Sequence, residues 1–422
     1  MSGLIPRHAT TRISELLRAF RVVVVGGARQ TGKTTLVRDL LALPPGARFS
    51  FDDEATLRRA EEDPIGFVEA LPRPAAVDEF QRAGRGLLLA VKQAADADRS
   101  RGRLLLTGSA NYLADRSISE TLAGRAGRLE LWPLSAGERR GFRESFLDHL
   151  FDQAAWPPPD RTPISRAELV DWLLEGGFPE VVTERLSGRS RRDWFAAYVA
   201  DVVSREALRP IADVRFEGEL QRVLRLLGAR ASAELVISDV AADAGLSRST
   251  TANYISLLEA LHLVVLIPAW ATSATTRAKR HPKVVLVDTG LAADLCGAGE
   301  AVFGARADGR LAGALFETLV ITEVCKQVGW SERVVDLYHF RDRNGPEVDL
   351  IVEDRRSGQV AGIEVKLSST PTDRHARHLR LLRDRLGDRF ALGLVVHAGP
   401  HSLPLGDRLW AVPVSAIWRT DP

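Results

Sequence analysis

The stretch RVVVVGGARQTGKTTLVRDLL, residues 21–41, limits the possible folds of this chain more than any other segment. Its four valines predict a buried strand, which leads through glycines into an apolar-periodic helix. Gly27, Gly32, Lys33 and Thr34 have the G-x-x-x-x-G-K-[ST] spacing of a phosphate-binding P-loop, in the strand–loop–helix order that this motif requires. The complete motif in this setting favours a phosphate site over an ordinary glycine turn. It predicts an α/β domain built on a parallel sheet.

The residue types in this loop suit a nucleotide and its metal ion. Glycines allow backbone N–H groups to turn inward around phosphate oxygens, and the following helix adds its positive end. Lys33 would neutralise the β and γ phosphates, and the Thr34 hydroxyl would coordinate Mg²⁺. The predicted cofactors are therefore ATP and Mg²⁺. The predicted contacts are Gly27, Ala28, Arg29, Gln30, Thr31, Gly32, Lys33, Thr34 and Thr35.

Two later apolar stretches predict further strands that end in polar residues. RPAAVDEFQR, residues 73–82, ends its strand at Asp78 and Glu79, where Asp78 would hold the Mg²⁺ shell and Glu79 would polarise the attacking water. RLLLTGSAN, residues 103–111, places Thr107 or Ser109 where a hydroxyl would touch the γ-phosphate or the water. A hydroxyl that only caps a turn is the alternative for this third strand.

These segments, together with LAGRAGRLELWPLSAGE, resemble a bacterial and archaeal family of AAA-type P-loop ATPases with a C-terminal domain of unknown function. GGFPE, PKVVLVDTGLA, FETLVITEV and FRDRNGPEVDLIVE also resemble that family, so the similarity covers nearly the whole chain. The resemblance implies an ATPase core, a helical and winged-helix middle and a nuclease-like end. It also makes Arg125 and Arg128 candidates for sensing the γ-phosphate, in cis or from a neighbouring subunit. In so arginine-rich a chain, solvated or structural arginines are the alternative.

The chain is expected to be α/β and multidomain, with four parts. Three consecutive prolines near residue 158 cannot lie inside a helix and mark a boundary. We predict the P-loop domain over residues 1–150, a helical subdomain over 165–211, a winged helix over 212–292 and a nuclease-like domain over 300–422.

The middle segment VISDVAADAGLSRSTTANYISLLEALHLVVLIPAW predicts a helix-turn-helix followed by the first strand of a wing. Ser247 would cap the second helix. Outward-facing residues of that helix would be Arg248, Ser249, Thr250, Thr251 and Asn253, and the wing would carry Arg277, Lys279, Arg280, His281 and Lys283. DNA contact through phosphates is one reading of this arrangement, and a module for protein interaction or packing is the other.

Near the C-terminus, PEVDLIVEDRRSGQVAGIEVKLS predicts a β-hairpin with carboxylates inside apolar strands. The order α-β-β-β-α-β around it resembles the PD-(D/E)xK nuclease fold, a restriction-endonuclease-like α/β domain. Glu364 and Lys366 lie two residues apart and share one strand face, which Asp349 on the paired strand can also reach. Asp349 and Glu364 would bind Mg²⁺, and Lys366 would position or deprotonate a water for attack on a phosphodiester.

Other residues are expected near this hairpin. Glu317 would add a ligand or hold a water, and Arg341 and Glu347 would line the same face. The alternative is a salt bridge of these carboxylates with Lys366 on a solvated sheet face.

Composition narrows the setting. The net charge is only +2, so a nucleic-acid surface must be local. Two widely separated cysteines predict free thiols in a reducing compartment, and the longest apolar runs have strand length, so we expect a cytoplasmic protein without a membrane partner. Only six of the 57 basic residues are lysine, namely Lys33, Lys92, Lys279, Lys283, Lys326 and Lys366. Lysine is expected where a compact ammonium is needed.

The sequence thus predicts a Mg²⁺-dependent ATP-hydrolysing protein coupled to DNA binding, with DNA cleavage as a further expectation. Glu79, Asp349, Glu364 and Lys366 are the predicted catalytic residues, and a homo-oligomer is compatible with an arginine from a neighbouring subunit. The alternative is a nucleotide-dependent regulatory switch or scaffold with a catalytically silent nuclease-like domain.

Overall fold

The computed structural model describes residues 4–108, 122–158, 164–204, 217–271, 280–304, 307–342 and 345–420. The chain forms two compact units, which are described separately. The first unit comprises residues 1–134, 178–180 and 260–262, and the second comprises residues 135–177, 181–259 and 263–422. Among the described residues, no helix combines the length and the apolar character that crossing a membrane would require.

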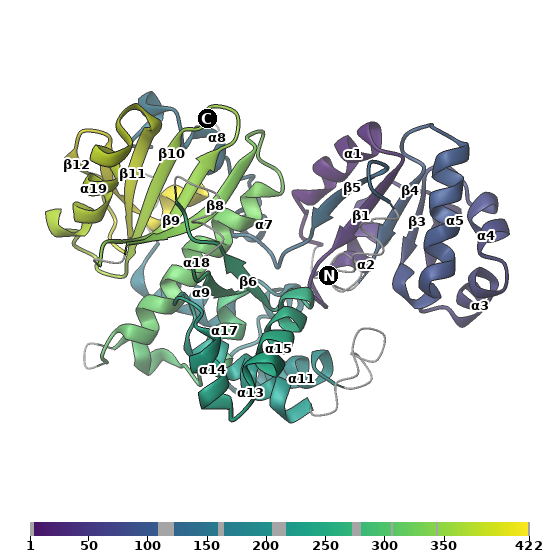
Figure 1. Ribbon diagram of the computed structural model, residues 1–422, viewed down its shortest axis with the longest axis horizontal. Coiled ribbons are helices and arrows are strands. Elements are labelled where there is room, and N and C mark those ends of the chain that lie inside the picture. Colours follow the sequence, from purple (N-terminus) through teal and green to yellow (C-terminus); the bar gives the residue numbers. More distant parts are fainter. Residues whose placement is uncertain are drawn as a thin grey trace. The chain divides into compact units, whose positions relative to one another are not determined.

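The first unit is built on a five-stranded sheet in the order β2-β3-β4-β1-β5, in which neighbouring strands are parallel (Figure 1). Its strands are β1 (Val22–Gly26), β2 (Arg48–Ser50), β3 (Ala75–Asp78), β4 (Leu104–Thr107) and β5 (Ala126–Glu130). Its helices are α1 (Ala9–Ala19), α2 (Lys33–Thr35), which continues as a π-helix (Leu36–Leu40), α3 (Glu54–Glu62), α4 (Pro64–Ala70) and α5 (Gly84–Ala97).

The side chains of β1 alternate between the two faces of this sheet, and both faces are buried. Val22 and Val24 belong to one apolar cluster and Val23 and Val25 to another. A strand points successive side chains to opposite faces, so a run of four valines suits a central strand that is covered on both sides. The predicted parallel α/β domain is therefore present. The predicted helix after the P-loop is shorter in its α-helical part, because a π-turn replaces its continuation.

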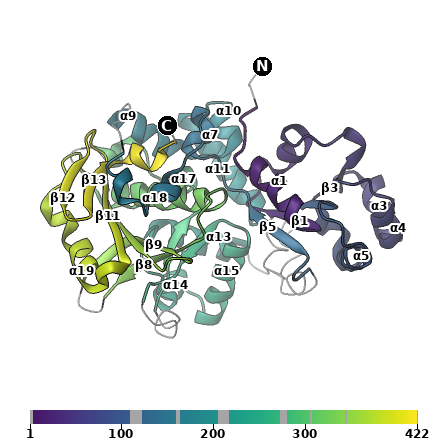
Figure 2. The same ribbon diagram turned by 90° about the horizontal axis from the view of Figure 1, so that it is seen from above.

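The second unit contains a six-stranded mixed sheet in the order β12-β13-β11-β10-β9-β8 (Figure 2). Its strands are β8 (Val335–Arg341), β9 (Glu347–Asp354), β10 (Val360–Lys366), β11 (Phe390–His397), β12 (Leu403–Gly406) and β13 (Leu409–Pro413). β9 and β10 are antiparallel neighbours, as the hairpin prediction requires, whereas β10 and β11 are parallel. α18 (Arg310–Val328) and α19 (Arg377–Leu386) both pack against β10.

The remainder of the second unit is mainly helical. Its helices are α7 (Ala136–Arg140), α8 (Phe146–His149), α9 (Arg166–Glu175), α11 (Gly188–Val202), α13 (Glu217–Ala229), α14 (Ile237–Ala244), α15 (Arg248–Ala260) and α17 (Thr289–Leu295). α10 (Pro179–Thr183) begins in the first unit and ends in the second. β6 (Val264–Ile267) and β7 (Lys283–Leu286) form a separate two-stranded antiparallel sheet.

Candidate functional sites

The loop between β1 and α2 depends on backbone conformations that favour glycine. Gly27 has a φ of +147° and Gly32 a φ of +91°. A Cβ atom at residue 27 would lie 2.2 Å from the carbonyl oxygen of Leu131, so even a methyl group would collide with the backbone there. Gln30 also has a positive φ, of 59°. The sequence of the loop therefore fits the tight path that a P-loop takes.

Lys33 is buried beneath this loop. Its ammonium donates hydrogen bonds to the carbonyl oxygens of Ala28, at 2.7 Å, and of Gly27, at 3.0 Å. Burial lowers the pKa of Lys33 to about 8, although the charges of Glu79 and Asp78 oppose that shift. The loop thus holds a cation, with only weak carbonyl partners, at the place where the motif expects phosphates.

Asp78 joins three segments at one edge of the sheet. Its carboxylate accepts a hydrogen bond from the Thr34 hydroxyl at 2.6 Å and another from the Thr107 hydroxyl. β1, β3 and β4 are neighbouring parallel strands, so their carboxyl ends meet at the same edge. A hydroxyl and a carboxylate side by side are hard oxygen ligands of the kind that Mg²⁺ prefers, so Thr34 and Asp78 fit that ion.

Glu79 follows Asp78 in a left-handed backbone conformation, with a φ of 53°. Its carboxylate accepts a hydrogen bond from the Gln81 amide. Burial, followed by the charge of Asp78, raises the pKa of Glu79, while the charge of Lys33 opposes the shift. Sequence reasoning did not single out Gln81, because a glutamine two residues from a carboxylate carries no motif signal.

The two candidate arginines lie elsewhere in the first unit. Arg125 precedes β5, at the amino end of its strand, and forms an ion pair with Asp96 whose longer hydrogen bond is 3.1 Å. The P-loop follows the carboxyl end of β1, roughly 15 Å away along the parallel strands at about 3.3 Å per residue. Arg128 lies within β5, level with Val24, and its side chain is exposed. Neither arginine is therefore placed beside the P-loop of the same chain. Ser109 falls outside the described residues.

Arg7 is a contributor that the sequence did not reveal. It is buried and donates one hydrogen bond to the Thr31 carbonyl and one to the Trp132 carbonyl, both at 2.6 Å. It therefore braces the P-loop against the segment after β5. No sequence signal identifies it, because 24 residues separate it from the loop.

The hairpin in the second unit brings its predicted residues together. The Lys366 ammonium lies 2.7 Å from Glu364 Oε1 and 4.0 Å from Asp349 Oδ2. Asp349 Oδ2 also accepts the backbone N–H of Val365 at 2.7 Å. Burial and the charge of Asp349 raise the pKa of Glu364 to about 8, and Lys366 opposes this shift.

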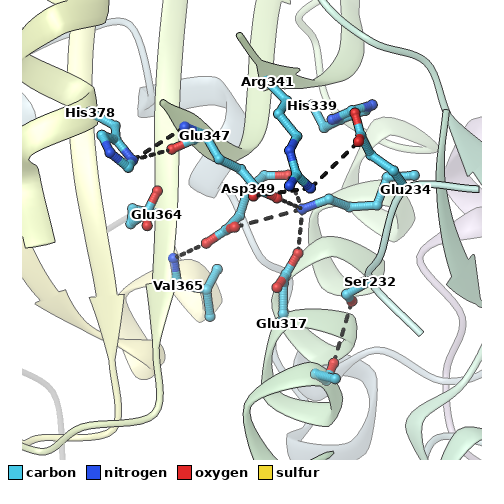
Figure 3. A network of polar contacts seen from close by, with 12 residues as sticks. Ser232, Glu234, Glu317, His339, Arg341, Glu347, Asp349, Glu364, Val365 and His378 are labelled. Carbon is cyan, nitrogen blue, oxygen red and sulfur yellow. Dashed lines mark hydrogen bonds and ion pairs between the residues drawn. The ribbon is translucent and has the colours of Figure 1, made fainter. Parts of the chain in front are cut away.

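Lys283 is a fourth charged residue of this region, although the sequence pattern predicted that it would lie on the wing of the winged helix. The Lys283 ammonium, from β7, lies 2.5 Å from Glu317 Oε1, 3.6 Å from Asp349 Oδ1 and 3.7 Å from Glu347 Oε1. In Figure 3, dashed lines join the carboxylates of Glu317 and Asp349 to one nitrogen, which is the ammonium of the unlabelled Lys283 side chain. Burial alone would lower the pKa of Lys283, but the charges of Glu317 and Asp349 raise it above its usual value. Lysine is therefore charged here.

We call Glu317, Glu347, Asp349 and Glu364 the carboxylate cluster. Glu317 was expected to be a metal ligand or to hold a water, but in the structure its carboxylate accepts the hydrogen bond of Lys283. Arg341 lies 3.6 Å from Glu347 Oε2 and 3.5 Å from Glu234. Within the described part of the chain, no group of three or more His, Cys, Asp or Glu side chains has an arrangement that could hold a metal ion.

The helix-turn-helix segment forms α14, a turn at Gly245 and α15, and the Ser247 hydroxyl accepts the N–H of Thr250 at 3.0 Å. Two predictions about its surface are wrong. Thr251 is fully buried because it lies on the inner face of α15, and Lys283 is fully buried because it pairs with the carboxylate cluster. Arg277 and Lys279 fall outside the described residues.

Family models match three separate parts of the chain. A model described as an AAA domain matches residues 19–139. Two models described as domains of unknown function, DUF8612 and DUF4143, match residues 166–301 and 312–417. With the parallel sheet and the loop geometry, the first match defines the first unit as an AAA-type P-loop domain. The DUF4143 match adds no activity to the C-terminal sheet.

Two mycobacterial proteins are similar to the chain over nearly its whole length. They are the uncharacterized proteins Mb2031c of Mycobacterium bovis and Rv2008c of Mycobacterium tuberculosis. Each is 27% identical over 423 residues, and the match covers 98% of this chain and 85% of the relative.

Solved structures give weaker similarities. AMPPCP-bound DnaA from Aquifex aeolicus has a TM-score of 0.27 and 15% identity, over 60% of this chain and 85% of that one. A RuvB variant from Thermotoga maritima has a TM-score of 0.29 and 17% identity, over 62% of this chain and 89% of that one. Scores this low define no shared fold, so the P-loop assignment rests on the AAA model and on the loop itself.

Proposed function

We propose that this protein binds and hydrolyses ATP with Mg²⁺ and couples that reaction to DNA binding. The observation that carries the proposal is the meeting of Lys33, Thr34, Asp78 and Thr107 at the carboxyl edge of an all-parallel sheet. Transfer of a phosphoryl group to water requires residues that bind the phosphates, hold the metal ion and orient the water, all close together.

Each residue has a distinct part in this proposal. Lys33 exchanges its bonds to Gly27 and Ala28 for the β and γ phosphate oxygens. Thr34 and Asp78 would hold Mg²⁺, which neutralises phosphate charge when bound. Glu79 orients a water toward the γ-phosphorus and accepts its proton as the bond to the β–γ bridging oxygen breaks. The raised pKa of Glu79 makes its carboxylate a better proton acceptor.

The proposed DNA partner is supported by the middle of the chain. Arg248, Ser249 and Asn253 are exposed on α15, the second helix of the helix-turn-helix segment. One arginine gives few phosphate contacts, so the expected affinity is modest and falls only gradually as the salt concentration rises.

ATP turnover with and without duplex DNA at low salt tests this proposal. We expect turnover that DNA raises and that Lys33→Ala abolishes. Lys92→Ala is the matched control, because Lys92 is a lysine of α5 in the same unit, away from the loop. Turnover that is equal in the parent and in Lys33→Ala would exclude the P-loop as its source.

We further propose that any γ-phosphate arginine comes from a neighbouring copy of the chain. Arg128 is exposed on the edge strand β5, which suits a contact in trans, whereas Arg125 is engaged by Asp96. ATP-dependent association in light scattering, reduced by Arg128→Ala, is the expected result. We propose the cytoplasm as the compartment, because the sequence has only two cysteines, Cys296 and Cys325, far apart in the chain.

For the second site, Asp349 and Glu364 with Lys366 are proposed as a Mg²⁺ pocket of nuclease-like type that cleaves DNA. A specific observation favours a second candidate, a nucleotide-dependent switch whose nuclease-like domain does not cut. A lysine ammonium already lies among three of the carboxylates.

Plasmid nicking with Mg²⁺ or Mn²⁺, in the parent and in Lys366→Ala, distinguishes the two. Nicking that Lys366→Ala abolishes supports cleavage. Nicking by neither protein, or equal nicking by both, supports the switch.

A further inference from the structure

Lys283 is the most deeply enclosed charge of the carboxylate cluster. Its side chain has 0% exposure, and besides its three carboxylate neighbours it donates a hydrogen bond to the Asp349 carbonyl oxygen at 3.2 Å. Burying an ammonium without partners is very unfavourable, so these oxygens must supply most of the compensation. The contacts therefore specify a cation at this point.

The oxygens come from different parts of the chain. Glu317 lies on α18, whereas Glu347 and Asp349 lie on β9. Carboxylate and carbonyl oxygens that converge from separate elements form the ligand set of a hard divalent ion. Instead, the oxygens of Glu317, at 2.5 Å, and of the Asp349 carbonyl, at 3.2 Å, accept hydrogen bonds from the ammonium, and Asp349 Oδ1 and Glu347 Oε1, at 3.6 and 3.7 Å, are within ion-pair distance. The Lys283 ammonium is bonded to the Glu317 carboxylate and the Asp349 carbonyl, so it competes with a divalent ion for the same oxygens, and their like charges oppose joint occupancy.

The carboxylate of Glu364 gives a second indication that the cluster can bind a further cation. Glu364 is 6% exposed, and its Oε2 has no hydrogen-bond partner among the described residues. The other oxygen of the same carboxylate is paired with Lys366, which also faces Asp349. A buried carboxylate oxygen without a partner beside Asp349 is an unused ligand.

We propose that Lys283 is a built-in cation that occupies the place of a divalent metal ion in the carboxylate cluster, and that the cluster accepts a metal only when this ammonium is absent. The inference deepens the proposed function, because it rests on the cluster being a cation site. It favours the second candidate function, in which the nuclease-like domain does not cut DNA while Lys283 is in place.

The origin of Lys283 gives this arrangement a route to regulation. β7 pairs with β6 in a two-stranded sheet that is separate from the six-stranded sheet carrying Glu347 and Asp349. The segment after β6 is hydrogen-bonded to β8, because the Trp270 N–H donates to the His339 carbonyl at 2.6 Å and the His339 N–H donates to the Pro268 carbonyl at 3.0 Å. Withdrawal of the ammonium by displacement of the two-stranded ribbon therefore also breaks these bonds, while the pairings within the six-stranded sheet need not change. The same ribbon follows directly after α15, the helix proposed to contact DNA.

Binding of Mn²⁺ to the full chain without nucleotide or DNA tests the inference. Equilibrium dialysis with electron paramagnetic resonance detection counts the bound ions. We expect Lys283→Met to bind one more Mn²⁺ than the parent, and its thermal midpoint to rise with Mn²⁺. Adding Asp349→Asn should remove both effects. Lys326→Met is the matched control, because Lys326 is also buried and paired with a glutamate, 2.6 Å away, yet lies outside the cluster.

Two results would overturn the inference. One is a Lys283→Met protein that binds no more Mn²⁺ than the parent or than Lys326→Met. The other is a parent protein that loses a bound Mn²⁺ when Asp349→Asn is introduced, since Lys283 would then not exclude the metal. The second comparison needs no Lys283 variant, so it can overturn the inference even if Lys283→Met does not fold. ATP binding at the P-loop is measured separately, so failure here leaves that proposal standing.

Discussion

Of the five lysines that the structure describes, three lie almost fully inside the protein. Lys33, Lys283 and Lys326 are each at most 5% exposed, and each ammonium has specific oxygen partners. A guanidinium is larger and planar, so it does not fit the same enclosed positions. These enclosed positions suit a compact ammonium, and Lys283 lies in a buried cluster and not on an exposed wing.

At the carboxylate proposed to be catalytic, Glu79→Gln should separate ATP binding from ATP hydrolysis. The amide keeps the shape of the side chain but cannot accept the proton of the attacking water. General-base assistance contributes roughly 10²- to 10⁴-fold, so we expect a fall of that size in single-turnover hydrolysis with unchanged ATP affinity. Hydrolysis at the parental rate would mean that another residue accepts the proton of the attacking water.

His397 should make the protein sensitive to acid. It is 1% exposed, and burial lowers the pKa of its imidazole to about 4 from 6.5. A lowered folded-state pKa means that the unfolded chain binds the proton more tightly, so stability falls as the pH drops from 6.5 toward 4. The thermal midpoint of His397→Gln should fall less steeply with pH over this window. Parallel slopes in the two proteins would remove His397 from the account.

Among the structural elements, the strands and turns of the P-loop were the most predictable. The valine run, the Asp78 strand end and the β9–β10 hairpin could be predicted because each has a local sequence pattern. Arg7 beside Thr31 and Lys283 beside Glu317 could not be predicted in this way. Their partners lie 24 and 34 residues away, and only packing brings them together.

The conformation of the P-loop makes Gly27 irreplaceable. Gly27→Ala places a Cβ 2.2 Å from the Leu131 carbonyl oxygen in a strained backbone region. Strain of this kind costs on the order of 1–3 kcal/mol before the collision is counted, so we expect a lower free energy of unfolding and loss of ATP binding. Gly46→Ala in the same unit is the control, because nothing lies within 4 Å of its Cβ position. Equal stability of the two variants would contradict the loop geometry.

The whole molecule consists of an AAA-type P-loop unit and a second unit that holds the helix-turn-helix segment and the carboxylate cluster. If ATP controls the second unit, ligands of the two units must influence each other reciprocally. We therefore expect a non-hydrolysable ATP analogue to change DNA affinity in a fluorescence-anisotropy titration. Lys33→Ala should remove that change while leaving nucleotide-free DNA binding intact. Identical DNA affinity with and without the analogue would show that ATP binding and DNA binding are not coupled.

The most direct test of the central claim is a calorimetric titration of the purified full chain with ATP and Mg²⁺. The account predicts saturable binding of one nucleotide. Lys33→Ala should weaken it on the order of 10- to 100-fold, because a hydrogen bond to a charged group contributes about 1.5–3 kcal/mol. Lys92→Ala should bind as the parent does. A parent protein with no affinity for ATP in the presence of any divalent ion would contradict the account.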